Sequence, residues 1–274
     1  MASSSPVMTI TEGTRVATTL AAWGRAIDRS VSARSAEAAA RLVEVILGQL
    51  PRHLPTYVRV LHLCWNEQAW NAGEEWGRRL LQADPGNAMA WRALAQAAED
   101  ENRRAEANII WRRAFEMSPY DPDIRAGLSR TSLDPHTALE YNLAGLAAIY
   151  MRGLRWQQAA DSYRRLAQAD RRRVDFQVSL AVALWQSGQT GEAYTLARHL
   201  VDHHPHLLMA WRTLAETGDE NDQALAESPI ATMDPDGEYA ATVWGIGSQD
   251  STATVLLTPE EVDLLQYKLP DTIA

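Results

Sequence analysis

The chain has 274 residues, 46% of them apolar, and a formal net charge of −9. This composition excludes collagen-like and globally disordered chains, and no apolar run reaches the length of a membrane-spanning helix. The only cysteine, Cys64, cannot form an intramolecular disulfide, and the first residues lack the layout of a secretory signal. We therefore expect a cytoplasmic protein.

The first residues, 1–13, are rich in serine and threonine and are expected to form a flexible N-terminus. From about Leu20 onward, apolar residues recur at helical spacing, in pairs of stripes with a period of 34 residues. Pro51, Pro85 and Pro119 follow this period. Each is expected to end a helix, because proline cannot donate the next backbone hydrogen bond and clashes with the preceding turn.

The clearest unit runs from Ala88 to Asp121. Apolar residues at i, i+3, i+4 and i+7 predict one helix, and a second stripe after a polar turn predicts another. Neither helix can bury its apolar face alone, so the pair must stack on neighbouring pairs. The two stripes are Trp91, Leu94, Ala95 and Ala98, and Ala107, Trp111, Ala114 and Phe115.

This unit resembles a tetratricopeptide repeat, whose pattern is W-x2-L-G-x2-Y, then A-x3-F, then P. Trp91, Leu94, Ala107 and Pro119 match that pattern. The glycine, tyrosine and phenylalanine of the pattern are replaced here by Ala95, Ala98 and Trp111. The resemblance covers about residues 20–217. It implies an all-α fold, a right-handed superhelical α-solenoid of stacked helix-turn-helix repeats.

The same phase divides the chain into segments. We expect a first block of repeats over 14–121, a break in register after Pro119, and an irregular insertion over 122–138. Asp121-Pro122 and Asp134-Pro135 each resemble a helix N-cap followed by proline, which predicts a short helix over about 122–130 and then a new start. A second block follows over 139–217. Small residues should be buried where the helices of a pair cross: Ala95, Ala107, Ala147, Ala159, Ala181 and Ala193.

The last segment, 218–274, differs in composition. Residues 216–274 hold thirteen acidic residues and one basic residue, whereas residues 1–215 hold 25 basic and 22 acidic residues. This C-terminal extension is nevertheless too apolar for a solvated tail. It contains two stretches rich in β-formers, 238–247 and 251–258, and an amphipathic stretch at 259–267. We expect it to pack on the repeats, its own or a neighbour's, with Trp244 as the anchor.

Residues that could support catalysis or metal binding are better explained as structural. His199 and His203 lie at i, i+4 near His204 and His206, but no cysteine accompanies them, so exposed histidines at a helix end are expected rather than a metal site. Cys64 falls on a core stripe and is expected to be buried. No nucleophile elbow or phosphate-binding glycine loop is present, so the sequence predicts neither an enzyme nor a cofactor.

Pairs of arginines recur on the second helices and suggest a phosphate-binding stripe, the mark of an RNA-binding repeat protein. Nearby acidic residues and the almost balanced charge of residues 1–215 favour solvated helix faces instead. The pairs are Arg78-Arg79, Arg103-Arg104, Arg112-Arg113 and Arg164-Arg165, followed by Arg171 to Arg173.

The resemblance also implies a partner site, because the first helix of each repeat lines the concave face of the superhelix in this family. Arg92 and Arg212 stand where some members carry a carboxylate clamp, but Gln96 and Glu216 replace its asparagine, so a chaperone-tail receptor is not expected. The residues expected on this face are largely apolar: Val58, His62, Trp65, Met89, Arg92, Gln96, Tyr141, Ala148, Met151, Arg152, Val178, Val182, Trp185, Met209 and Arg212.

Three functional hypotheses follow. The first is a non-catalytic adaptor that binds an apolar or amphipathic segment of a partner protein in its groove. The second is a structural subunit whose groove and extension are permanently buried in an oligomer or a larger complex. An RNA-binding helical repeat is the third and the least supported.

Overall fold

The computed structural model describes residues 16–134, 139–248, 252–259 and 261–262. It divides into two compact units. Unit 1 combines the residues up to Glu67 with those from Ala231 onward, and unit 2 comprises Gln68–Ile230. This division differs from the predicted one: the expected insertion at 122–138 lies inside unit 2, and the expected extension contributes to both units. Residues 1–13, expected to be flexible, lie outside the described residues.

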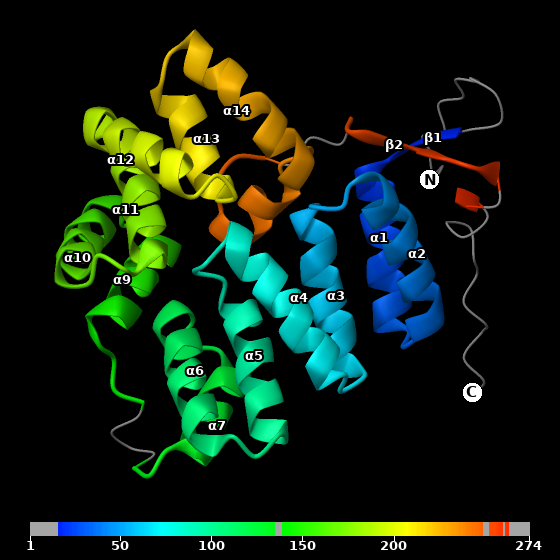
Figure 1. Cartoon of the computed structure of the whole chain (residues 1–274), viewed down its shortest axis with the longest axis horizontal. Coiled ribbons are helices and arrows are strands. Elements are labelled where there is room, and N and C mark those ends of the chain that lie inside the picture. Colours follow the sequence, from blue (N-terminus) through cyan, green and yellow to red (C-terminus); the bar gives the residue numbers. More distant parts are fainter. Residues whose placement is uncertain (1–15, 135–138, 249–251, 260, 263–274) are drawn as a thin grey trace, which may run out of the picture. The chain divides into compact units, whose positions relative to one another are not determined.

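Unit 2 is built from consecutive helices, each of which contacts the next along most of the unit (Figure 1). The second helix of each pair has 14 residues. The helices are α4 (Trp70–Ala83), α5 (Ala88–Asp100), α6 (Arg104–Met117), α7 (Pro122–Thr131), α9 (Leu143–Arg152), α10 (Trp156–Ala169), α11 (Val174–Gln186), α12 (Thr190–His203), α13 (Leu208–Thr217) and α14 (Glu220–Met233), whose last three residues belong to unit 1.

Small residues occupy the helix crossings of unit 2, as predicted. Side chains of this size let two helix backbones approach closely, so the apolar stripes on either side can interdigitate. The six alanines expected to be buried all have 0% exposure, which confirms this prediction: Ala95, Ala107, Ala147, Ala159, Ala181 and Ala193.

The turn inside each helix pair has one shape that recurs with the repeat. A residue with a left-handed backbone follows the first helix, and the next amide donates to a carbonyl five residues earlier, which ends the helix. Glycine adopts this conformation without strain, but only one repeat uses it. The left-handed residues are Arg34, Gln68, Asn102, Leu154 and Gly188, with φ of 56°, 54°, 59°, 54° and 83°.

The turn between pairs also recurs. At the third or fourth residue of a first helix, a side chain donates a hydrogen bond to the carbonyl oxygen six residues earlier, at the end of the preceding repeat. This bond fixes the entry into the helix and satisfies a carbonyl that the turn leaves without a backbone partner. The five donor and acceptor pairs are Tyr57–Pro51, Trp91–Pro85, Arg125–Pro119, Gln177–Arg171 and Trp211–Pro205.

The predicted short helix is confirmed as α7, where the Asp121 carboxylate accepts hydrogen bonds from the amides of the first turn, at 2.9 and 3.1 Å. Its register, however, differs from the prediction. Arg125 lies 34 residues after Trp91 and makes the equivalent hydrogen bond, so α7 is the first helix of a regular repeat. The eleven residues 132–142 are too few for a second helix of 14. The register therefore breaks after Thr131, not after Pro119. The expected helix start at Asp134-Pro135 lies partly outside the described residues.

Gly127 of α7 explains how this repeat still packs. A Cβ atom there would overlap the indole of Trp111, which is fully buried. The tryptophan stands where the family pattern has phenylalanine, and the glycine supplies the space for the larger ring. α6 contacts both α7 and α9, so the array continues across the break.

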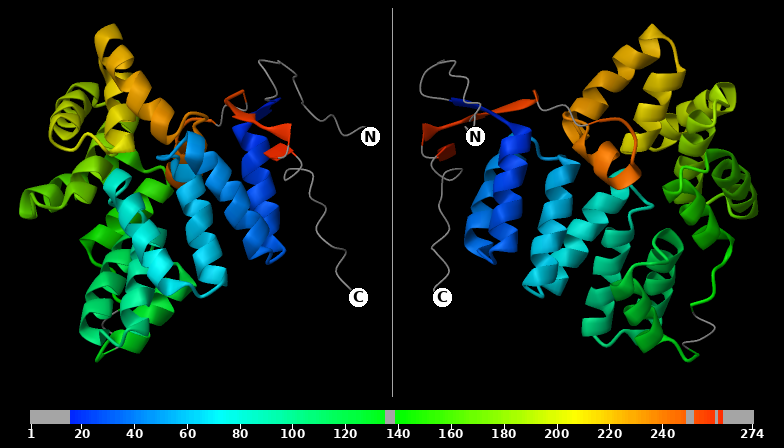
Figure 2. Two further views of the ribbon diagram at one scale, coloured as in Figure 1. Left: turned by 45° about the vertical axis from the view of Figure 1, so that its right-hand side comes forward. Right: turned by 180° about the vertical axis from the view of Figure 1, so that it is seen from behind.

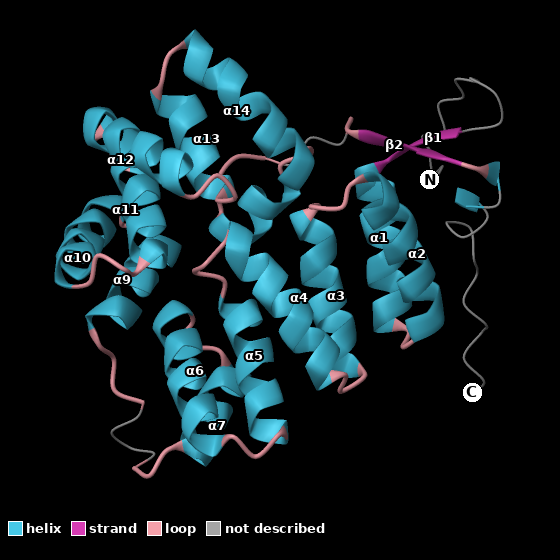
Figure 3. Cartoon of the chain, viewed as in Figure 1, coloured by secondary structure: helices cyan, strands magenta, loops and turns pink. Residues whose placement is uncertain are grey.

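Unit 1 consists of α1 (Leu20–Ser32), α2 (Ala36–Gln49), α3 (Leu54–Asn66), a π-helical turn, Ala240–Trp244, and two strands, β1 (Val16–Thr19) and β2 (Thr254–Leu257). The strands pair antiparallel, with Val16 opposite Leu257 and Thr19 opposite Thr254. Figure 3 shows this ribbon as the strand component of an otherwise helical chain. The fold is thus an array of helical repeats, as expected, with a small two-stranded ribbon that was not.

Two contacts attach the C-terminal residues to the helices of unit 1. The Gln49 side chain accepts a hydrogen bond from the Leu256 amide, at 3.2 Å, and donates one to its carbonyl, at 2.6 Å. It therefore covers part of the open edge of β2, which an unpaired strand would expose. The views in Figure 2 show α1 and α2 beside the ribbon from two further sides.

The second contact is an ion-pair network around Arg59 of α3. Its guanidinium pairs with Glu238, at 2.6 Å, and with Asp28 of α1, at 2.9 Å. Burial lowers the pKa of Arg59, but the hydrogen bonds to both carboxylates outweigh burial and raise it. Gly24 permits this arrangement, because a Cβ there would collide with the guanidinium. Such forked, charge-assisted pairs are among the strongest polar contacts in proteins.

The residues beyond Thr217 thus differ from the expected extension. α14 has the length of a second helix, so the array continues to Met233. The stretch at 238–247, expected to favour β structure, contains the π-helical turn, whereas the stretch at 251–258 contains β2. Trp244, the expected anchor, is half-buried, while Tyr239 has 1% exposure. The apolar residues 264–267 lie outside the described residues.

Replacing Ala193 by leucine is expected to lower the free energy of unfolding by about 1–3 kcal/mol, because the added atoms have no space at the helix crossing. Ala105, an exposed residue of α6, provides the control. Ala105→Leu should leave the thermal midpoint nearly unchanged. If Ala193→Leu also left the midpoint unchanged, the position of the crossing would be wrong.

Candidate interaction surfaces

The residues predicted for the concave face do not form one exposed surface. The exposed ones are His62, Tyr141 and Arg152. The half-buried ones are Val58, Trp65, Met89, Arg92, Gln96, Met151, Trp185 and Arg212. The buried ones are Ala148, Val178, Val182 and Met209, with 6%, 2%, 0% and 1% exposure.

The buried members correct the prediction at four positions. α11 buries side chains around most of its circumference, as expected for a helix that is apolar on nearly all sides, and it contacts both α12 and α13. The 3.6-residue pattern identifies the face that meets the partner helix, but it does not show which other faces a third helix covers. The position expected for a carboxylate clamp is also engaged, since Arg92 pairs with Asp123 at 2.9 Å.

An apolar patch at the start of α9 was not predicted. Leu146 is 38% exposed, whereas the leucine at the same repeat position is 5% exposed in α5, 0% in α7, 8% in α11 and 0% in α13. Leu143, one turn earlier, is 37% exposed. In a regular repeat these positions pack on the second helix of the preceding repeat. The repeat of α7 has no such helix, so this face of α9 is left open.

Aromatic residues adjoin the open face of α9. Tyr141, 43% exposed, stacks on Phe115 at a centroid distance of 6.0 Å and meets Tyr120 edge-on at 5.8 Å. We refer to Tyr120, Tyr141, Leu143 and Leu146 as the α9 patch. The sequence signal for it was the missing second helix: Leu143 and Leu146 match the repeat pattern with no helix before them to cover them.

Ion pairs hold the patch in place across the register break. Arg173, before α11, pairs with Asp175 at 2.6 Å and with Glu116 of α6 at 2.9 Å. Glu116 also accepts a hydrogen bond from Asn142, the N-cap of α9, at 3.1 Å. These bonds join α6, α9 and α11, so the open face of α9 belongs to a fixed structure.

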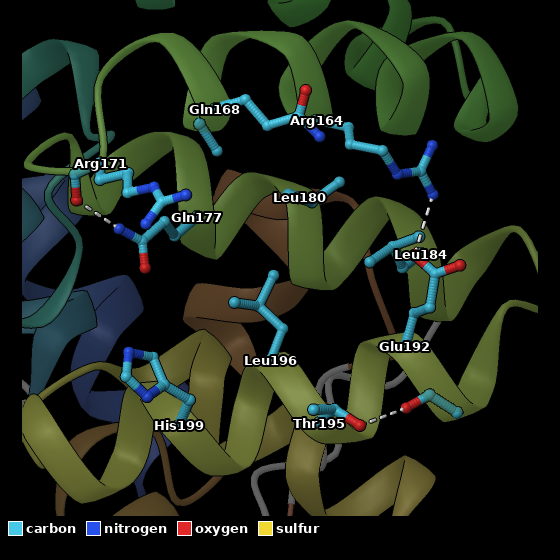
Figure 4. A pocket seen from close by; sticks show the side chains of 12 residues that line it. Arg164, Gln168, Arg171, Gln177, Leu180, Leu184, Glu192, Thr195, Leu196 and His199 are labelled. Atoms are coloured by element: carbon cyan, nitrogen blue, oxygen red, sulfur yellow. Dashed lines mark hydrogen bonds and ion pairs between the residues drawn. The ribbon is translucent and has the colours of Figure 1, made fainter.

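A groove runs between α10 and α12, with α11 as its floor (Figure 4). Its volume is about 930 Å³. Leu180, Leu184 and Leu196 line the floor, and polar side chains form the rim. None of its lining residues belongs to the set predicted for the concave face. The rim residues are Arg164, Gln168, Arg171, Gln177, Glu192, Thr195 and His199.

Most of the paired arginines bind neighbouring groups, as the interpretation of solvated faces requires. Arg78 and Arg79 pair with glutamates one turn earlier, and Arg164 pairs with Asp161 and Glu192, both at 3.1 Å. Arg104 donates to the carbonyl of Arg130 at 2.8 Å. These contacts leave few free cations for a phosphate stripe.

The histidines and the cysteine have the predicted surroundings. His199, His203, His204 and His206 are exposed at the end of α12 or just after it, and the described residues contain no group of three potential metal ligands. His203 Nδ1 lies 2.9 Å from the carbonyl oxygen of His199. Cys64 is 7% exposed, and burial raises the pKa of its thiol, which suits a core residue rather than a nucleophile. Within the described part of the chain, no helix is both long and apolar enough to span a bilayer.

Comparisons with known proteins give little beyond this geometry. No protein-family model matches the chain, and no curated protein matches it. Among solved structures, one of Naa15/Naa10 bound to HypK-THB is similar over 77% of this chain, with 16% sequence identity and a TM-score of 0.32. The match spans 31% of the other chain, about a third of its length.

Proposed function

We propose that the chain is a non-catalytic interaction scaffold of the tetratricopeptide-repeat type, and that the α9 patch binds an amphipathic helix of a partner protein. The exposure of Leu146, at a position that is buried in the other repeats, supports this proposal most directly. Exposed apolar groups gathered on a rigid surface are typical of protein interfaces. The recurrence of the 34-residue turns supports the assignment to this repeat type.

The array itself indicates the kind of partner. Elsewhere in unit 2, this face of a first helix is covered by the second helix of the preceding repeat, which presents small and aromatic side chains one turn apart. A partner helix with that pattern would complete the interrupted repeat, and Tyr141, Met151 and Arg152 would lie beside it. A helix in an apolar groove is a common mode of peptide recognition. The lone, buried Cys64 is compatible with a reducing compartment such as the cytoplasm.

The stability of two alanine variants tests whether the patch is open. Leu146→Ala should lower the free energy of unfolding by about 1 kcal/mol or less, because Leu146 has already lost part of its packing. Leu180→Ala, at the same repeat position but 8% exposed, should cost about 2–5 kcal/mol. Urea unfolding of both variants provides the measurement. Equal losses would mean that the α9 patch is covered in solution.

The binding function requires a second experiment. A photo-crosslinking residue at position 146 of the full chain should capture a specific partner in extracts of the native host. The Leu143→Ala substitution should abolish that capture, and a crosslinker at Leu225, an isolated exposed leucine of α14, should not give it. Capture at both positions, or at neither, would contradict the proposal.

The alternative of a structural subunit predicts different behaviour in solution. An adaptor should be monodisperse alone and should bind its partner reversibly, whereas a subunit should assemble or aggregate as its concentration rises. Light scattering over a wide concentration range separates the two. Strongly salt-dependent binding to single-stranded RNA would support the third hypothesis.

A further inference from the structure

We propose that the groove between α10 and α12 is a second docking site, and that it binds an amphipathic helix of a partner protein with acidic residues clustered at one end. This inference rests on the proposed function as an interaction scaffold, but it concerns a different surface from the α9 patch. The two sites can therefore be tested separately.

The floor of the groove provides the apolar part of the site. Leu180 and Leu184 lie one turn apart on α11, and Leu196 of α12 faces the same hollow (Figure 4). Leucines spaced this way suit a ligand helix that buries side chains at i, i+4 and i+7. The volume of about 930 Å³ lies in the range of specific binding pockets.

The charges on the rim differ between the two ends of the groove. At one end, Arg164 hydrogen-bonds with Glu192 at 3.1 Å and with Gln189 at 3.0 Å, so its charge is neutralised locally. At the other end lies Arg171, an exposed residue whose guanidinium forms no ion pair with any described carboxylate. Figure 4 shows His199 at this same end of the groove.

This asymmetry indicates the chemistry and the direction of the ligand. An acidic turn near Arg171 would gain a charge-assisted hydrogen bond, and His199 would add to it when protonated. Acidic residues at the other end would instead meet Glu192, and like charges that close disfavour binding. The site should therefore prefer a helix that is acidic at one end only, and should orient it along the groove.

Gly191 of α12 offers a means of blocking the groove without straining the fold. It lies on the lining, and a Cβ added there would meet nothing within 4 Å. A tryptophan at this position can extend into the groove. Ala105 of α6 occupies the same repeat position outside the groove and is exposed, so Ala105→Trp is a matched control.

The test measures binding of two labelled helical peptides to the full chain by fluorescence anisotropy. Both carry leucines at i, i+4 and i+7, and their first turn contains either glutamates or lysines. The glutamate peptide should bind saturably. Gly191→Trp should weaken this binding at least about 30-fold, while Ala105→Trp and Leu146→Ala should not change it. Arg171→Glu should weaken the glutamate peptide about 10-fold and improve binding of the lysine peptide.

Three results would overturn the proposal: no saturable binding of the glutamate peptide, equal binding by Gly191→Trp and Ala105→Trp, or no change of charge preference in Arg171→Glu. Arg171 is exposed, so its substitution reports on binding even if Gly191→Trp fails to fold. A functional α9 patch with an inactive groove would refute this inference alone. An active groove with an inactive patch would refute the α9 site alone.

Discussion

Replacing Trp111 by alanine is expected to lower the free energy of unfolding of unit 2 by about 3–5 kcal/mol. The indole is fully buried between α6 and α7, where Gly127 provides its space, and its Nε1 donates to Glu99 at 3.0 Å. Alanine would leave a cavity that the surrounding helix backbones cannot fill. It would also remove the hydrogen bond that helps to position Glu99 for its ion pair with Arg130, at 2.8 Å.

Trp76 of α4 provides the control for this experiment. It lies in the same unit, is only half-buried, and has the guanidinium of Arg79 at 4.5 Å from its ring centroid. Trp76→Ala should cost much less than Trp111→Ala in urea unfolding, and hydrogen exchange should locate the loss in Trp111→Ala to α5, α6 and α7. If the two tryptophans cost the same, Trp111 would not be the centre of packing between these helices.

Much of the helical array was predictable because its packing is local and repeats. Alanines at the crossings, such as Ala107 and Ala193, are fixed by the contact between two adjacent helices, and a period of 34 residues identifies that contact in each repeat. The turn residues were less predictable. The left-handed conformation occurs at Arg34 and Leu154, where the residue type gives no sign of it, because hydrogen bonds of the neighbouring helices impose it.

The errors have a common cause, since each involves a contact that the repeat does not encode. Val178 and Val182 match a solvent-facing stripe, yet α11 also contacts α13 and buries them. α7 was taken as irregular because only its successor is missing, and a missing helix does not change the pattern before it. β2 pairs with a strand more than 200 residues away, and no local pattern identifies such a partner.

The same reasoning shows why the α9 patch was missed and how it could have been found. Residues that match a core pattern are normally assigned to the core, and Leu143 and Leu146 match it well. Whether they are buried depends on the preceding second helix. Counting the residues between consecutive first helices would have shown that this helix is absent. In repeat proteins, an interrupted repeat is therefore a position to search for exposed apolar residues.

His53 lies at the start of α3 in unit 1 and is 2% exposed. Its Nδ1 lies 2.8 Å from the hydroxyl of Thr56, but its Nε2 has no hydrogen-bond partner among the described residues. Burial, with a smaller contribution from the charge of Arg59, lowers the pKa of His53 to about 3. The same repeat position in α5 is Asn87, whose side chain accepts a hydrogen bond from the Ala90 amide at 3.0 Å. Asparagine therefore suits this position and does not titrate.

Acidification is expected to destabilise unit 1 through His53. The folded state keeps the imidazole neutral down to a pKa of about 3, whereas the unfolded state binds a proton below about 6.5. The unfolded chain thus binds more protons between these values, so this contribution to stability is complete above pH 6.5 and is lost as the pH falls toward 3. The loss should reach about 2 kcal/mol at pH 5. His53→Asn should remove it, whereas His199→Asn, at an exposed site, should not. Urea unfolding at pH 7.5 and pH 5, followed by the fluorescence of buried Trp23, measures the difference. An equal loss in wild type and His53→Asn would show that His53 accepts a proton in the folded protein.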